Sequence, residues 1–349
     1  MRIKFRGAGL SFAALFLGLG LALGLTALFG ENPIQVFQVL FVGALGSATD
    51  VGYSLYYATP LLLTGLSVAW AMRAGLFNIG ADGQMMLGGV AMAIVGISLP
   101  NLPAFIGLPL ALTAAFVAGG LWGAIAGWMK SKRGCHEVLS TILLNFIAYG
   151  LSGFLILGVF KNPVSQVPET AQVGKGYEIA QMPFGGTSPL NWSFLLALAA
   201  IAVYGFVMRR TKFGAHQRMV GSAPEAGRRA GINIDRQTIL AMFISGGLAA
   251  LAAASPVLGF SLKTREGFTS NAGFVGIAVA LLGRNRSFGL ILSALLFGIL
   301  TKGALDLDMD TQYIPRDLST VIQALIVLAV ACQAGLGDLW SRAKRGDKA

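Results

Sequence analysis

The chain has 349 residues, of which 55% are hydrophobic and only 12% are charged, and its mean hydropathy is +0.71. About a quarter of the residues in a soluble globular domain are charged, so this composition excludes that class and indicates a polytopic membrane protein. The formal net charge is +11. Because the basic residues stand in short loops between apolar runs, they indicate retention on one side of a membrane and not nucleic-acid binding.

The first apolar run covers residues 8–29 and follows Arg2, Lys4 and Arg6. A signal peptide has an apolar core of about 7–15 residues, and this run is longer and can span a bilayer. We therefore expect a retained first helix, with a cleaved signal as the alternative.

Apolar segments of about 20 residues, the length that crosses a bilayer, recur along the whole chain. We predict an all-α fold, a polytopic transmembrane helical bundle of about ten spans in a single domain. The predicted spans are 8–29, 51–72, 83–99, 103–129, 138–160, 192–208, 237–260, 273–283, 287–305 and 318–335. The eighth of these is short.

The loops obey the positive-inside rule if the N-terminus is placed in the cytoplasm. If successive loops are assigned alternately to the two sides of the membrane, 20 of the 26 Lys and Arg residues lie inside. Both termini are predicted to be cytoplasmic, and so is the basic segment 209–236. Residues 161–191, rich in Pro and Gly, are predicted to form an external loop or a short interfacial helix.

Two short glycine motifs match each other across the chain. NIGADG at 78–83 and NAGFVG at 271–276 share the pattern N-x-G-x-x-G, and each follows a span that contains a proline, Pro60 or Pro256. Five predicted spans separate the copies, so they are inverted in the membrane. This pattern is typical of transporters built from inverted-topology repeats, here with halves at about 8–160 and 192–335. The alternative is that the glycines only allow close helix packing.

Backbone interrupted within a bilayer is tolerated only where protein or a water-filled cavity satisfies its polar groups. The polar residues at the two motifs are therefore candidates for the translocation path: Asn78, Asp82, Gln84 and Asn271. Asp82 is either functional or a charge at a helix N-terminus that is stabilised by the helix dipole. Arg73 is a possible partner for it.

The fifth predicted span carries a polar stripe. Thr141 and Asn145 are four residues apart and share a helix face, with Glu137 one turn earlier. Such a stripe either lines a path or holds helices together. His136 has no second histidine at ligand spacing, and Cys135 and Cys332 show no C-x-x-C pattern, so neither a metal site nor a disulfide is expected.

The segment 209–236 contains the signals of a short helix over 223–230. Ser222 and Glu225 form a predicted capping box, Pro224 stands in the first turn, and Gly231 suits a left-handed C-terminal cap. A helix this short does not persist alone in water, so it needs a docking partner. The alternative is an ordinary basic loop.

GSAPEAGRRAGI in this segment resembles the cytoplasmic coupling segment of ABC importer permeases that carry branched-chain amino acids, simple sugars and nucleosides. In that family the segment inserts into a cleft on a separate ATPase. The resemblance, with the predicted cap, assigns coupling to five candidate residues: Ser222, Glu225, Arg228, Arg229 and Gly231.

RAGLFNIGADGQMMLGG and CHEVLSTILLNFIAYGL resemble the signatures of the nucleoside-importing branch of this family. The resemblance implies a multi-pass protein of the bacterial cell membrane that imports a small molecule, a nucleoside. It also implies three partners: a cytoplasmic ABC ATPase, a second and often different permease subunit, and an extracytoplasmic substrate-binding protein. A permease for simple sugars is the alternative within the family.

No G-x-x-x-x-G-K-[ST] motif occurs in the chain, so we do not expect it to hydrolyse ATP by that route or to be an enzyme, and no cofactor is predicted. The rival interpretation is an ion-coupled secondary transporter in which Asp82 is the coupling acid. In such a transporter the predicted helix at 223–230 would have no role.

Overall fold

The structure is a computed structural model, which describes residues 32–184 and 186–310, together with 18, 20, 21, 23, 24, 26–28, 30, 321, 324 and 325. The predicted spans 8–29 and 318–335 and Cys332 lie largely or wholly outside these residues. The two predicted cytoplasmic termini lie outside them as well.

The described chain is helical, with isolated β-bridges and no strand in the described ranges. Seven of its helices are long and apolar enough to cross a membrane, and α12 is a shorter apolar helix. The α-helices are α2 Pro33–Leu45, α3 Ala48–Arg73, α4 Ala81–Ser98, α5 Ala104–Arg133, α6 Glu137–Phe154, α7 Ser193–Arg210, α8 Lys212–Ser222, α9 Pro224–Arg229, α10 Ile234–Leu251, α11 Ala254–Pro256, α12 Ala272–Leu282 and α13 Ser287–Asp310. The predicted helical membrane bundle is confirmed.

Short turns of other helix types extend this set. A π-turn at Leu155–Val159 continues α6, a second at Val257–Ser261 continues α11, and Lys175–Tyr177 forms a 3₁₀ turn. The eight predicted spans from 51–72 to 287–305 each correspond to a helix, including the short one, α12, which has 11 residues. Among the described helices, α2 and α8 were not predicted. The 13 residues of α2 are too few to span, although Asn32 caps it and Pro33 starts it, both ordinary start signals.

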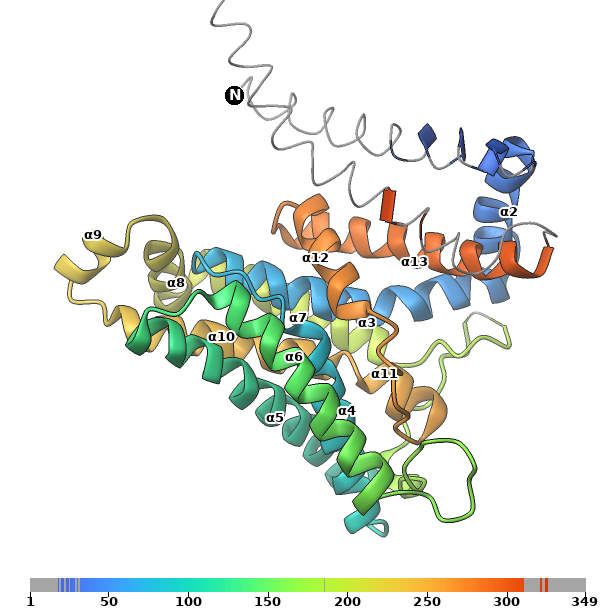
Figure 1. Ribbon diagram of the computed structural model, residues 1–349, viewed down its shortest axis with the longest axis horizontal. Coiled ribbons are helices and arrows are strands. Elements are labelled where there is room, and N and C mark those ends of the chain that lie inside the picture. The colour runs from blue at the N-terminus through green and yellow to red at the C-terminus, as the bar shows by residue number, and fades with distance from the viewer. Residues whose placement is uncertain are drawn as a thin grey trace, which may run out of the picture.

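Three helices form the interior of the bundle. In the most apolar stretch of α3, of α4 and of the α10–α11 span, 72% of the residues are buried, against 22% to 28% in α5, α6 and α7. In Figure 1, α5 and α6 run along one edge of the molecule, and α12 and α13 lie on the opposite side of α3. The uncovered apolar faces of α5, α6 and α7 are therefore available to lipid or to another protein.

Small residues allow the closest helix contact. A Cβ on Gly119 of α5 would lie 2.5 Å from the carbonyl oxygen of Gly246 on α10, and a Cβ on Gly246 would lie 2.1 Å from the Gly119 oxygen. Membrane helices often pack through small residues in this way, because no hydrophobic force drives them together in lipid. Glycine at these positions therefore sets the spacing between α5 and α10.

The loop 161–191 lies towards the opposite end of the molecule from α8 and α9 (Figure 1). Buried Glu169 fixes the loop, because its carboxylate accepts from Lys263 Nζ at 2.8 Å and from Arg265 Nε at 3.0 Å. The hydrogen bond from Lys263 lowers the pKa of Glu169 to about 2, against the opposing effect of burial. We call these three residues the loop clasp. It ties the loop to the segment that precedes α12.

Candidate functional site

The first glycine motif breaks the chain between α3 and α4, and α6 supplies partners for the exposed backbone. The Asn145 side chain accepts from the Gly83 amide at 3.0 Å and donates to the Ile79 carbonyl at 3.0 Å. Thr141 Oγ1 accepts from the Ile79 amide at 3.3 Å. The predicted polar stripe therefore holds α6 against the start of α4, as irregular backbone at membrane depth requires.

Asn78 and Gln84 pair with each other in the interior. Asn78 Nδ2 donates to Gln84 Oε1 at 2.8 Å, and Gln84 Nε2 donates to Asn78 Oδ1 at 3.2 Å. Asn78 also donates to the hydroxyl of Ser245 on α10 at 2.8 Å. Both amides are fully buried, and the hydrogen bonds satisfy them there. They fix the turn before α4 against α10.

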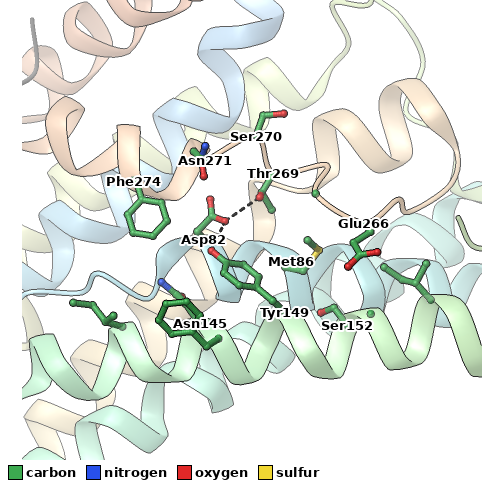
Figure 2. A pocket seen from close by; sticks show the side chains of 15 residues that line it. Asp82, Met86, Asn145, Tyr149, Ser152, Glu266, Thr269, Ser270, Asn271 and Phe274 are labelled. Atoms are coloured by element: carbon green, nitrogen blue, oxygen red, sulfur yellow. Dashed lines mark hydrogen bonds between the residues drawn. The ribbon is translucent and has the colours of Figure 1, made fainter. Parts of the chain in front are cut away.

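Asp82, in the first turn of α4, is buried and accepts three hydrogen bonds. Its Oδ2 accepts from Tyr149 at 2.8 Å and from Thr269 at 2.9 Å (Figure 2). Its Oδ1 accepts from the backbone amide of Gly273, in the first turn of α12, at 3.0 Å. A buried carboxylate with three donors and two nearby helix N-termini is well compensated.

Arg73 is not the partner of Asp82, and that expectation was wrong. Arg73 Nε donates to the Tyr204 hydroxyl at 3.1 Å, and its Nη2 donates to the carbonyl of Asn285 at 2.7 Å. Arg73 ends α3, whereas Asp82 follows the seven-residue turn that leads away from it. The arginine therefore joins α3 to α7 and to the turn before α13.

The two matching motifs meet at Asp82. Asn271 precedes α12 in the left-handed conformation, with φ of 61°, and its side chain does not cap the helix. A Cβ on Gly273 would lie 2.2 Å from the Asp82 amide nitrogen, so the contact requires glycine there. Asp82 thus serves as the cap of α12, and the second copy of the glycine motif packs against the first.

A cavity of about 540 Å³ opens beside this contact (Figure 2). Of the six predicted path residues, Asp82, Asn145 and Asn271 line it, whereas Asn78, Gln84 and Thr141 do not. The full lining consists of Asp82, Met86, Ile142, Asn145, Phe146, Tyr149, Ser152, Gly153, Ile156, Glu266, Gly267, Thr269, Ser270, Asn271 and Phe274.

Several lining residues were not predicted. Tyr149 continues the stripe of Thr141 and Asn145 at a spacing of four, so helical periodicity could have identified it. Ser152 lies about one turn further on, and its buried hydroxyl has no hydrogen-bond partner among the described residues. Thr269 and Glu266 come from the irregular turn before α12, and no local pattern marks them.

The cavity combines polar groups with flat apolar walls. Asp82, Glu266 and Asn145 provide oxygen and amide groups, while Phe146, Tyr149 and Phe274 provide aromatic rings. Ligand sites typically have this mixture of apolar lining and a few convergent polar groups. The cavity is therefore suited to a small polar molecule that carries a flat ring.

The helix α6 leaves this side of the molecule uncovered. Phe146, Ile147 and Phe154 are 57% to 67% exposed although they lie on a membrane-length apolar helix. On a helix of this length such a face can meet lipid or another protein.

The predicted helix at 223–230 appears as α9, Pro224–Arg229, but Ser222 does not cap it. Ser222 is the last residue of α8, and its hydroxyl donates to the Arg218 carbonyl at 2.8 Å. Ala223 precedes α9, with no side-chain cap. The predicted capping box was wrong, because α8 continues to Ser222 and supplies its hydroxyl with a partner.

The end of α9 agrees with the prediction. Gly231 has φ of 79°, the Ile232 amide donates to the Gly227 carbonyl at 3.0 Å, and the Gly231 amide donates to Arg228 at 3.1 Å. These two bonds are the Schellman arrangement of a left-handed cap. Glu225 pairs with Arg228 at 2.9 Å, and both side chains are exposed.

The helix α9 projects from one end of the molecule (Figure 1). All of its residues are exposed except Gly227, which packs on Met219 and Ile234. The preceding helix α8 makes a backbone contact with the turn before α4, because a Cβ on Gly75 would lie 2.9 Å from the Gly221 Cα. The exposed α9 is therefore connected to the site at Asp82 through α8 and through the turn that leads into α4.

Comparison with known proteins identifies similar chains. Residues 51–331 match the family model described as "Branched-chain amino acid transport system / permease component". The guanosine ABC transporter permease protein NupP of Bacillus subtilis is 34% identical, over 95% of both chains. The nucleoside ABC transporter permease protein NupB of Lactococcus lactis is 33% identical, over 99% of this chain and 96% of the relative. The glucose ABC transporter permease protein TsgB13 of Haloferax volcanii is 34% identical, over 88% of this chain and 83% of the relative.

Proposed function

Since the chain belongs to the branched-chain amino acid transport system permease component family, and is thus a membrane-spanning permease subunit of an ABC transporter, we propose that it imports a nucleoside. Two relatives that carry nucleoside names and one that carries a glucose name are almost equally identical to it. Overall identity therefore does not separate the two cargo classes.

The observation that carries the nucleoside proposal is the lining of the cavity at Asp82. Phe146, Tyr149 and Phe274 offer aromatic faces on which a flat base can stack. Asn145 and Glu266 offer polar groups for the edge of a base or for the ribose hydroxyls. A sugar can use the polar groups, but its ring is puckered and not aromatic, so it does not stack on these faces as a flat base does.

A second permease subunit, different from this chain, completes the path. The exposed apolar residues of α6 lie beside the cavity, and a partner that packs on them would close its open side. The candidate path residues are then Asp82, Asn145 and Asn271 at the cavity, with Asn78, Gln84 and Thr141 holding the interrupted backbone behind them.

The exposed helix α9 docks on a cytoplasmic ATPase. Its exposed residues include Glu225, Arg228 and Arg229, and the capped Gly231 fixes its end. The basic segment 209–236 then lies in the cytoplasm, as the positive-inside rule favours. The loop 161–191, towards the other end, faces an extracytoplasmic binding protein (Figure 1).

ATP-driven closure of the ATPase moves α9 and α8. The contact between Gly221 and Gly75 passes this movement to the turn that begins α4, and the bond between Asp82 and Gly273 passes it to α12. The path thereby closes on one side of the membrane and opens on the other, as a population shift between two packed states.

Uptake by proteoliposomes tests this function. The chain is reconstituted with its second permease, its ATPase and its binding protein, and uptake of labelled guanosine is measured with glucose as competitor. We expect ATP-dependent uptake that excess inosine abolishes and excess glucose does not. Competition by glucose alone would reverse the cargo assignment, and uptake driven by a proton or Na⁺ gradient without ATP would place the chain in another transport class.

Two variants test the docking of α9. Glu225→Ala combined with Gly231→Ala is expected to lose ATPase co-purification or ATP-driven uptake while the permease stays in the membrane. The exposed ion pair of Glu225 contributes at most about 1 kcal/mol to stability, and alanine at Gly231, where φ is 79°, costs about 1–2 kcal/mol, so a thermal melt checks that the permease is still folded. Asp235→Asn, which removes another exposed ion pair, is the matched control.

A further inference from the structure

We propose that an arginine-lined pocket between α3, α7, α8 and the start of α13 binds the phosphate group of an anionic phospholipid. The pocket has a volume of about 360 Å³ and is separate from the cavity at Asp82. Four of its nine lining residues are arginines: Arg73, Arg209, Arg218 and Arg286. None of the lining residues is acidic.

No acidic side chain of the described residues neutralises the charge of this pocket. Within the described part of the chain, none of its four arginines forms an ion pair. Arg73 is held at the back of the pocket by the Asn285 carbonyl and the Tyr204 hydroxyl, both of which are uncharged partners. Four converging cations without an anion are costly, and a bound phosphate would relieve their repulsion.

The backbone favours an anion at the same place. Helix α13 begins at Ser287, which lines the pocket, so the positive end of the α13 dipole points into it. A Cβ on Gly205 of α7 would lie 2.8 Å from the Ser287 hydroxyl, so α7 and α13 approach closely here. The amides of a helix N-terminus and four arginines together make a phosphate site.

A second hollow with exposed aromatic side chains continues from this pocket, which favours a lipid over a soluble phosphate. It has a volume of about 440 Å³ and shares Gly205, Arg209 and Ser287 with the pocket. Its other lining residues are Ala202, Arg210 and two phenylalanines, Phe206 and Phe288, which are 63% and 71% exposed. Both belong to membrane-length helices, α7 and α13, so acyl chains can lie along them while the headgroup reaches the arginines.

Lipid retention by the purified chain tests the proposal. The protein is placed in nanodiscs of phosphatidylcholine with a minor share of phosphatidylglycerol, and the lipids that remain bound after detergent extraction are measured by native mass spectrometry. We expect selective retention of phosphatidylglycerol. In Arg209→Gln/Arg286→Gln the retention should fall roughly 25-fold, from roughly fivefold for each basic side chain.

A matched double variant separates the pocket from general surface charge. Arg133→Gln/Arg236→Gln removes two exposed arginines outside the pocket and should keep wild-type retention. Arg209 and Arg286 are also exposed, so both variants should fold, and a thermal melt checks this. Equal losses in both variants would overturn the proposal.

Two further outcomes would also overturn the lipid assignment. The first is complete displacement of phosphatidylglycerol by millimolar inorganic phosphate, which would identify a site for a soluble anion. The second is full lipid retention by Arg209→Gln/Arg286→Gln together with loss of ATPase co-purification, which would identify a protein-docking surface. Arg209→Lys/Arg286→Lys, which keeps the charge, should retain the lipid to within about threefold of the wild type.

Discussion

Asp82 caps the first turn of α12 through a 3.0 Å hydrogen bond from Gly273, which lies 191 residues further along the chain. The two residues belong to the two copies of the glycine motif, so the start of one copy is completed by the other. Neither helix start is independent of the other, and a change at this contact should affect both folding and transport.

Asp82→Asn should reduce both stability and transport. The amide keeps an acceptor for Gly273 but loses the negative charge that Tyr149 and Thr269 donate to, at an expected cost of about 1–3 kcal/mol. We expect ATP-driven uptake to fall by roughly tenfold or more. A thermal melt in detergent measures the stability of the same variant. Asp235→Asn removes only an exposed ion pair and should change stability by less than about 0.5 kcal/mol. Unchanged uptake in Asp82→Asn would reduce Asp82 to a charge at a helix end.

Gly273→Ala should disrupt the contact between the two glycine motifs and destabilise the fold. The added Cβ would meet the Asp82 backbone at 2.2 to 2.4 Å, and backbone on a packed helix cannot move away cheaply. We expect a loss of about 1–3 kcal/mol or more in the free energy of unfolding. Gly150→Ala is the matched control, since its Cβ meets nothing within 4 Å and alanine favours a helix. Equal melting temperatures for the two variants would contradict the close contact.

Gly75→Ala should impair coupling more than its strain alone predicts. Gly75 and Gly134 have φ of 72° and 67°, so alanine costs about 1–2 kcal/mol at either position. Only Gly75 has a neighbour, Gly221, whereas a Cβ on Gly134 meets nothing within 4 Å. ATP-driven uptake should therefore fall in Gly75→Ala and remain in Gly134→Ala, and a thermal melt of both variants separates the loss of coupling from any loss of stability. A similar fall in both would show that strain explains the effect.

Glu169→Gln should release the loop 161–191. The pKa of Glu169 lies at about 2, below its ordinary value of 4.5, so the stability that it contributes is present above pH about 4.5 and is lost as the pH falls towards about 2. The protection factor of the wild-type loop amides, which corrects hydrogen exchange for its intrinsic dependence on pH, should fall across this window. In the variant the protection factor should already be low at pH 7 and should not change between pH 4.5 and 2.

The matched control for the loop clasp is Glu178→Gln. Glu178 is an exposed acid in the same loop and forms no ion pair within the described ranges. The protection factor of the loop in Glu178→Gln should follow that of the wild type at every pH. A protection factor of the wild-type loop that stays constant between pH 4.5 and 2 would contradict the role given to Lys263 and Arg265.

Hydropathy predicted the long helices because the bilayer fixes their length. The predicted spans 51–72 and 103–129 differ from α3 and α5 by only a few residues at each end. Helix α2 escaped the prediction because 13 residues cannot span a bilayer, and a length criterion ignores the cap at Asn32.

The site was predictable only where a local pattern reflects a long-range contact. The matching motifs indicated Asp82 and Asn271, and a helical stripe indicated Asn145. The partners Tyr149 and Thr269 depend on how α6 and the turn before α12 sit against α4, which no spacing encodes. Ser222 was misassigned because a serine hydroxyl can bond to the preceding turn of its own helix, as it does with Arg218.

The carbonyl of Asn285 receives hydrogen bonds from both Arg73 and Tyr204. One oxygen therefore fastens the end of α3, the middle of α7 and the turn before α13 at a single point. None of these three elements can slide past the others without breaking at least one of these bonds, so we expect them to move together during the transport cycle. Relative motion should then concentrate elsewhere, in α6 and in the short turns on either side of α4 and α12.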